Sequence, residues 1–158
     1  MISAAPLDSL LILPLPWADL SEAAELEARY FPVSWSLEQY QEEVERGTCQ
    51  VHGVRGETGL VGYVSCLVLP PEMEIVNMAV TAALRCRGLG RALVQAALEH
   101  GAGRGVELCH LEVDETNIPA LRLYAALGFR QTGRRRGYYQ GAGKNNDAIL
   151  MQCVLKCP

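Results

Sequence analysis

A short stretch rich in glycine and arginine, residues 85–93 (RCRGLGRAL), has the residue types and spacing of an anion-binding turn. The apolar run Ile75–Val80 before it predicts a buried strand. Leu89, Leu93 and Ala96 recur at helical spacing and predict an amphipathic helix after it. A glycine turn between a strand and a helix leaves several backbone N–H groups free at the positive end of the helix dipole. Because phosphate is the usual anion at such a place, the stretch predicts a site for a phosphate-bearing ligand.

The size and charge of the chain limit the classes of protein to which it can belong. The 158 residues are 49% hydrophobic and 20% charged, which predicts one globular domain over residues 1–158. The net charge of −4 argues against direct binding of nucleic acid, which favours a basic surface. The apolar run Leu10–Leu15 is too short to span a bilayer and lacks the basic flank of a signal peptide. We therefore expect a cytoplasmic protein without a membrane partner.

The six cysteines form no C-x-x-C pair, and no spacing of cysteine and histidine matches a zinc site. We therefore expect no metal. Several cysteines lie within apolar, strand-like runs, where a thiol behaves as a small hydrophobic group. The sequence thus predicts reduced thiols in the core of a cytosolic protein.

The order of predicted elements indicates a mixed α/β domain. An edge strand over Leu10–Leu15 precedes one helix capped by Asp19 or Ser21 and another from Leu37 to about Arg46. The helix of the glycine turn ends near His100, with a flexible loop over Gly101–Gly105, and a further helix runs from Asn117 to a stop at Gly128. A polar loop is expected over Gly141–Asp147. Strands are predicted at Thr48–Arg55, Leu60–Leu69, Glu74–Val80, Val106–Val113, Phe129–Thr132, Arg136–Gln140 and Ala148–Leu155.

Two familiar phosphate-binding motifs do not fit. A dinucleotide-binding fingerprint requires a third glycine where Leu93 stands. A Walker motif ending at Lys144 would need a glycine in place of Tyr138 and a serine or threonine in place of Asn145. The run Gly141–Lys144 is therefore interpreted as a solvated turn.

A third motif fits, and it comes from a known family. Arg85-x-x-Gly88-x-Gly90 resembles the acyl-CoA pyrophosphate motif, R/Q-x-x-G-x-G/A, of the GNAT N-acetyltransferases. A second block, with Leu111–Val113, Asn117 and Ala120–Phe129, lies at the distance typical of that family. The resemblance covers essentially the whole chain. It implies the GNAT fold, an α/β (α+β) arrangement with a single mixed, mostly antiparallel sheet flanked by about four helices, and acetyl-CoA as co-substrate.

Within this superfamily the chain is most similar to the RimI-type ribosomal-protein alanine N-acetyltransferases. The similar segments are Asn77–Val80, Arg87–Leu93, Leu123–Phe129, Arg135–Tyr139 and Asp147–Met151. The turn Phe31–Ser36 is two residues longer than that family's F-P-W-S turn, and Cys86 stands where a basic residue is common.

The resemblance implies acetylation of the N-terminal α-amine of a protein, such as the alanine terminus of a small-subunit ribosomal protein. Two alternatives remain. The acceptor is another amine (a protein lysine, a polyamine or an amino sugar), or the chain is a non-catalytic acetyl-CoA-binding module.

The same resemblance assigns roles to individual side chains. An amine attacks a thioester only when unprotonated, so a base is needed, and the family's glutamate falls at Glu112. Glu74 on the preceding strand is the rival base. Tyr124 falls at the tyrosine that protonates the departing thiolate, and Asn117 caps its helix and contacts CoA. His110 shares a strand face with Glu112 but is interpreted as a structural histidine.

Backbone groups are expected to contribute as much as side chains. The strand Met78, Ala79 and Val80 would lie beside the pantetheine arm and polarise the acetyl carbonyl. Aromatic walls for a peptide N-terminus are expected from Trp35, Tyr138 and Tyr139. The pyrophosphate would be held by the backbone and charges of Arg85, Cys86, Arg87, Gly88, Leu89, Gly90 and Arg91.

Overall fold

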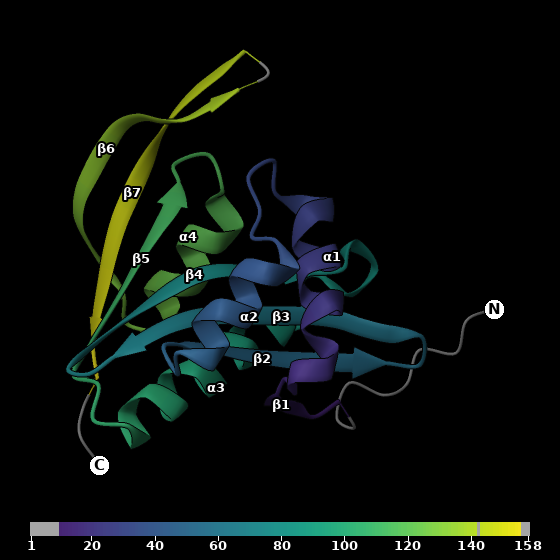
Figure 1. Cartoon of the computed structure of the whole chain (residues 1–158). Coiled ribbons are helices and arrows are strands. Elements are labelled where there is room, and N and C mark those ends of the chain that lie inside the picture. Colours follow the sequence, from purple (N-terminus) through teal and green to yellow (C-terminus); the bar gives the residue numbers. More distant parts are fainter. Residues whose placement is uncertain (1–9, 142, 156–158) are drawn as a thin grey trace.

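Figure 1 shows the computed structural model, which describes residues 10–141 and 143–155. Within these residues the strands form one seven-stranded sheet in the order β1-β2-β3-β4-β5-β7-β6. Neighbouring strands are antiparallel except for β4 and β5, which run parallel. The predicted mixed, mostly antiparallel sheet is confirmed. The ends of the predicted domain, residues 1–9 and 156–158, and the loop residue Ala142 lie outside the described residues.

The elements follow the chain in two groups. The first group contains β1 (Ile12–Pro14), η2 (Trp17–Asp19), α1 (Leu20–Tyr30), α2 (Leu37–Glu45), β2 (Cys49–Gly56), β3 (Gly59–Leu69), β4 (Glu72–Val80) and η3 (Ala82–Leu84). The second contains α3 (Leu89–Gly103), β5 (Leu108–Asp114), α4 (Ile118–Ala126), β6 (Arg130–Gly141) and β7 (Lys144–Val154).

Local signals in the sequence set several of these boundaries. Ser36 caps α2, and its hydroxyl accepts from the Gln39 backbone N–H while the Gln39 side chain accepts from the Ser36 N–H, a complete capping box. Asn117 caps α4 by accepting from the Ala120 N–H at 3.2 Å. Gly128 follows the end of α4 with a φ of 93°, a left-handed conformation that glycine adopts without steric cost. Asp19 is the N-cap of α1, although its side chain makes no capping hydrogen bond.

Two predicted loops are wrong. Helix α3 continues through Gly101 to Gly103, because Gly101 is a packing position where a side chain would collide with the sulfur of Met73. The polar run expected to be a loop over Gly141–Asp147 belongs largely to a hairpin, in which Gly141 pairs with Lys144 and Tyr139 with Asn146. Polar residues are tolerated there because both faces of this hairpin are partly solvated.

The two short strands predicted at 129–132 and 136–140 are instead the single strand β6. Its pairing with β7 shifts register between Gln131 and Gly133 and again between Arg135 and Tyr139. Such irregularities break the alternation of side chains, which is why the sequence pattern indicates two strands.

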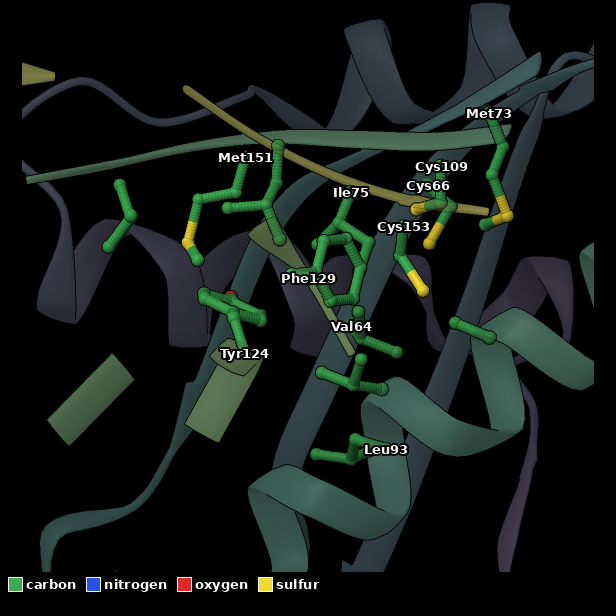
Figure 2. Packing of buried hydrophobic residues seen from close by; sticks show 14 of the residues in the cluster. Val64, Cys66, Met73, Ile75, Leu93, Cys109, Tyr124, Phe129, Met151 and Cys153 are labelled. Atoms are coloured by element: carbon green, nitrogen blue, oxygen red, sulfur yellow. The ribbon is translucent and has the colours of Figure 1, made fainter. Parts of the chain in front are cut away.

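The helices cover the sheet on both faces. Helices α1 and α2 pack on one face through a cluster that includes Leu20, Tyr40 and Tyr63. Helices α3 and α4 pack on the other face through a larger cluster, in which Leu93 of α3 lies close to Val64 of the sheet (Figure 2). Because side chains alternate along a strand, β2, β3 and β4 contribute to both clusters, whereas the buried hydrophobic side chains of β5 belong to the larger one.

The buried cysteines confirm the predicted core thiols in part. Cys49, Cys66, Cys109 and Cys153 are buried, whereas Cys86 is exposed. Burial raises the pKa of Cys49 and of Cys109 to about 12, so these thiols are protonated at neutral pH. Cys157 lies outside the described residues.

Two findings concern the described residues as a whole. No helix among them is long and apolar enough to cross a membrane. No group of three or more His, Cys, Asp or Glu side chains in the same residues is placed to hold a metal ion.

Candidate active site

The parallel strands β4 and β5 separate partway along their length. They pair over four positions, from Glu72 with Leu108 to Ile75 with Leu111. Beyond this point β4 pairs only with β3, and β5 pairs only with β7, within the described residues. The two halves of the sheet fan apart in Figure 1. The edge of β4 from Val76 to Val80 therefore presents backbone groups to the gap instead of to a strand.

The glycine turn follows directly at the end of β4. Cys86 has a φ of 59° and Gly88, the N-cap of α3, has a φ of 84°, so the backbone turns through two left-handed residues. The first N–H bonded back to this turn is that of Ala92, which donates to the Gly88 carbonyl at 3.0 Å. The N–H groups of residues 89–91 find no acceptor in the described chain. The predicted strand, turn and helix with free N–H groups are confirmed.

The arginines of this turn lie in different environments. The Nε of Arg85 donates to the Val80 carbonyl at 3.0 Å, and its guanidinium stacks on the ring of Tyr30, 4.7 Å from the centroid. Arg85 therefore ties the turn to β4 and α1. Arg87 and Arg91 are exposed, and neither forms an ion pair with a described residue.

A pocket of about 370 Å³ lies on the face of β5 that carries Glu112. The Glu112 side chain retains 22% of its exposure, and its Oε1 lies 3.3 Å from the Nε of Arg135. Glu74, on the neighbouring strand, lines the same pocket, and burial together with the charge of Glu112 raises its pKa. The other lining residues are His110, Leu111, Thr132, Arg135, Tyr138, Leu150, Met151 and Gln152.

His110 is held on both ring nitrogens. The amide of Gln152 donates to Nδ1 at 3.0 Å, so the ring proton sits on Nε2 and donates to Glu72, also at 3.0 Å. This arrangement satisfies the ring and confirms the interpretation of His110 as a structural histidine.

Tyr124 lies on the opposite side of β5 from Glu112. It belongs to the cluster of Leu111 and Val113, whose side chains alternate with Glu112 along the strand. Its ring packs edge-on against Phe129 with centroids 5.5 Å apart, as Figure 2 shows. Burial raises the pKa of the Tyr124 hydroxyl above its usual value, so the hydroxyl keeps its proton at neutral pH. No described residue forms a hydrogen bond with it.

The three aromatic residues predicted to form acceptor walls do not meet in one place. Tyr138 is 52% exposed and lines the Glu112 pocket, with Tyr139 packed against it at right angles. Burial and the charge of Glu112 raise the pKa of Tyr139 to about 12. Trp35 lines a separate hollow of about 260 Å³ with Leu67 and residues of α2.

Sequence reasoning missed Glu27, which the structure buries completely in α1. A signal was available, because positions 20, 23, 27 and 30 lie on one face of a helix and position 27 therefore belongs to the buried stripe. A glutamate in that stripe requires hydrogen-bonding partners inside the protein.

The fold and this arrangement define an acyltransferase of the GNAT class, and comparisons with known proteins agree. Residues 20–129 match the Acetyltransferase (GNAT) family. The N-alpha-acetyltransferase RimI of Mycobacterium tuberculosis is 36% identical over 141 residues, covering 85% of this chain and 86% of that protein. The ribosomal protein bS18-alanine N-acetyltransferase of Escherichia coli is 30% identical over 141 residues, covering 89% of this chain and 94% of that protein.

Solved structures lead to the same family. The crystal structure of the Escherichia coli ribosomal-protein-S18-alanine N-acetyltransferase has a TM-score of 0.84 with 28% identity, covering 94% of this chain and 96% of that one. Arabidopsis thaliana NAA60 in complex with acetyl-CoA shares the fold, with a TM-score of 0.82 at 22% identity over 93% of this chain and 99% of that one. The chain spans only 38% of the length of one further relative, an uncharacterised Mycobacterium leprae protein that is 37% identical over 142 residues.

The chain therefore belongs to the GNAT acetyltransferase family. Within that family it groups with the RimI-type N-acetyltransferases.

Proposed function

We propose that the protein transfers the acetyl group of acetyl-CoA to the N-terminal α-amine of a protein. The observation that carries the proposal is the separation of β4 and β5, with a carboxylate pocket on one face of β5 and a protonated, unbonded tyrosine hydroxyl on the other. The reaction would take place in this gap: the amine would enter from the pocket, and the thiolate would leave on the far side.

The turn after β4 fits the pyrophosphate of acetyl-CoA. The free N–H groups of residues 89–91 point out of the positive end of a fifteen-residue helix. The position of a Cβ on Gly88 has no atom within 4 Å, so the space above the turn is open to a ligand. Arg87 and Arg91 add positive charge beside the turn. Asn117, at the start of α4, follows β5 and lies on the β5 side of the gap.

The edge of β4 is suited to the acyl chain. Met78, Ala79 and Val80 lie on the part of the strand that has no β5 partner, and their free backbone groups would bond the pantetheine amides and the acetyl oxygen. When bound, acetyl-CoA supplies the activated acetyl thioester.

Glu112 is the proposed base. Its carboxylate lies in the pocket beside the gap and would accept the amine proton directly or through one water. An α-amine has a reference pKa near 8, so a carboxylate is basic enough to assist. Glu74 remains the second candidate, since it lines the same pocket and its raised pKa makes it a stronger base.

Tyr124 is the proposed acid. Its hydroxyl is protonated and has no described hydrogen-bond partner, and it belongs to α4, the helix that follows β5. A donor in this position would protonate the departing thiolate of CoA.

The proposed acceptor is the N-terminal alanine of a small-subunit ribosomal protein, since the Escherichia coli relative is named a ribosomal protein bS18-alanine N-acetyltransferase. Such a substrate would place the protein in the cytoplasm. Two carboxylates in the acceptor pocket, Glu74 and Glu112, suit an ammonium group on its way to deprotonation. A lysine, polyamine or amino-sugar acceptor is the alternative, and a non-catalytic acetyl-CoA-binding module is a second one.

Thiol release from acetyl-CoA with a panel of peptides tests the proposal. Peptides with a free N-terminal alanine are expected to release thiol, and the same peptides with a blocked N-terminus and an internal lysine are not. Release with polyamines or blocked peptides alone would favour the other acceptors. Binding of acetyl-CoA without release with any amine would favour the non-catalytic module.

A further inference from the structure

Glu27 is a carboxylate in the interior of the molecule, with 0% of its surface exposed. Four groups donate hydrogen bonds to it. Its Oε1 accepts from the Trp35 backbone N–H at 2.8 Å and from the Asn77 amide at 2.9 Å. Its Oε2 accepts from the Tyr63 hydroxyl at 2.9 Å and from the Tyr40 hydroxyl.

The carboxyl group of Glu27 is an acceptor in each of these bonds. All four partners donate, so the group acts only as an acceptor, and it forms no ion pair with a described residue. A buried acidic side chain is costly even when hydrogen-bonded, and an apolar replacement of similar volume often gives equal stability. Stability alone therefore does not account for a glutamate at this position. The parts of the chain that its four hydrogen bonds hold together offer another reason.

The two oxygens bind different parts of the molecule. Oε2 binds Tyr40 of α2 and Tyr63 of β3, which belong to the core on this face of the sheet. Oε1 joins the loop between α1 and α2, at Trp35, to β4 at Asn77, which lies within the part of the strand that has no β5 partner. In Figure 1 this loop and the β6–β7 hairpin extend toward the same end of the molecule.

A separate contact fixes the end of α1 from which the loop departs. The Tyr30 hydroxyl accepts from the Ala82 N–H at 3.1 Å, and Arg85 stacks on the Tyr30 ring. The start of the loop is thus anchored beside the glycine turn, and the capping box at Ser36 fixes its other end on α2. Between these anchors, the bond from Trp35 to Glu27 sets the position of the loop relative to β4.

We propose that Glu27 is a positioning residue for the acceptor: its Oε1 holds the Phe31–Ser36 loop against β4 and thereby shapes the entrance for the peptide N-terminus. This inference rests on the proposed function, since it concerns the acceptor side of the same site.

Fluorescence of Trp35 tests the position of the loop without any catalysis. The chain has two tryptophans, and Trp17→Phe removes the other one. In that background Glu27→Gln is expected to at least double the quenching of Trp35 by acrylamide, because the amide cannot accept all four bonds. Tyr63→Phe is the matched control, since it removes a donor to the same carboxylate on the core side, and it is expected to leave quenching unchanged.

Steady-state kinetics tests the effect on the acceptor. Glu27→Gln is expected to raise KM for an N-terminal alanine peptide about tenfold while KM for acetyl-CoA changes less than twofold. Tyr63→Phe is expected to lower the melting temperature with both KM values unchanged. Asn77→Ala, which removes the β4 partner of Oε1, is a second variant for the case that Glu27→Gln does not fold, and it is expected to raise KM for the peptide.

The outcomes separate this inference from the proposed function. Unchanged Trp35 quenching in Glu27→Gln, or an equal rise in both KM values, would overturn the positioning role even if the enzyme acetylates N-termini. Increased quenching in a protein that acetylates no N-terminal peptide would uphold the control of the loop but overturn its assignment to this acceptor.

Discussion

The two sides of the gap between β4 and β5 are built by different means. The proposed cofactor side consists of backbone groups from one continuous stretch, residues 78–91, whose shape depends on a glycine and a helix start. The proposed acceptor side consists of side chains from strands far apart in sequence, with Glu74 on β4, Glu112 on β5 and Tyr138 on β6. A continuous backbone site leaves a motif in the sequence, whereas a dispersed side-chain site becomes visible only through the topology.

Removing the carboxylate of Glu112 on the acceptor side is expected to have the largest effect on catalysis. Glu112→Gln is expected to lower kcat/KM for the peptide by roughly 100- to 1000-fold, the usual contribution of a general base. Glu74→Gln is the matched control in the same pocket and is expected to cost less than tenfold. Initial rates of thiol release measure both variants, and a larger loss in Glu74→Gln would transfer the role of base to Glu74.

Removing the hydroxyl on the other face tests the division of roles across β5. Tyr124→Phe is expected to lower kcat by roughly 100-fold with little change in either KM, because the ring still packs against Phe129. Phe129→Leu, which disturbs the same packing without removing a hydroxyl, serves as the control in thermal melts and rate measurements. An unchanged kcat in Tyr124→Phe would show that the thiolate leaves without a tyrosine donor.

Alanine substitutions at two glycines distinguish the effect of backbone strain on stability from the effect of the turn on ligand binding. Gly88 and Gly105 both have a φ of 84°, and at neither residue would an added Cβ have another atom within 4 Å. Alanine at either position is expected to cost about 1 kcal/mol of stability through left-handed strain. Only Gly88→Ala is expected to raise KM for acetyl-CoA, by about tenfold, because its methyl group enters the space above the free N–H groups.

Kinetics and thermal melts of both variants measure this difference. Equal KM values for acetyl-CoA in Gly88→Ala and Gly105→Ala would contradict the assignment of the pyrophosphate to the turn.

The smallest expected effect concerns the stability of the acceptor pocket. Because burial and Glu112 raise the pKa of Glu74 in the folded protein, its contribution to stability is present at acidic pH and lost as the pH rises through that pKa. Glu74→Gln is therefore expected to raise the melting temperature by about 1–3 °C at pH 7. The gain should vanish as the pH falls below the ordinary value of 4.5. A gain that persists at acidic pH would contradict the proposed charge repulsion.

The sequence predicts the strand, turn and helix around Gly88 well for a physical reason. Arg85-x-x-Gly88-x-Gly90 lies between an apolar strand and an amphipathic helix, so local patterns alone define the turn. The same local rules predict the capping of α2 by Ser36 and of α4 by Asn117. The resemblance adds the candidates Glu112 and Tyr124, and the alternation of β5 explains why they lie on opposite faces.

Long-range contacts are what the sequence does not reveal. The partner of Glu112 is Arg135 and the partners of Glu27 lie 8 to 50 positions away, and no local pattern encodes such pairs. The register shifts of β6 give one strand the sequence pattern of two, and Trp35 lies in a hollow apart from Tyr138. These features depend on how the strands are ordered in the sheet.

The most direct test of the central claim is the position of the acetyl group on a product. A peptide with a free N-terminal alanine and one internal lysine, incubated with acetyl-CoA and the protein, is analysed by tandem mass spectrometry. Acetylation of the α-amine with the lysine unmodified is expected, and this product is expected to be lost with Glu112→Gln. Acetylation of the lysine side chain with a free N-terminus would contradict the central claim.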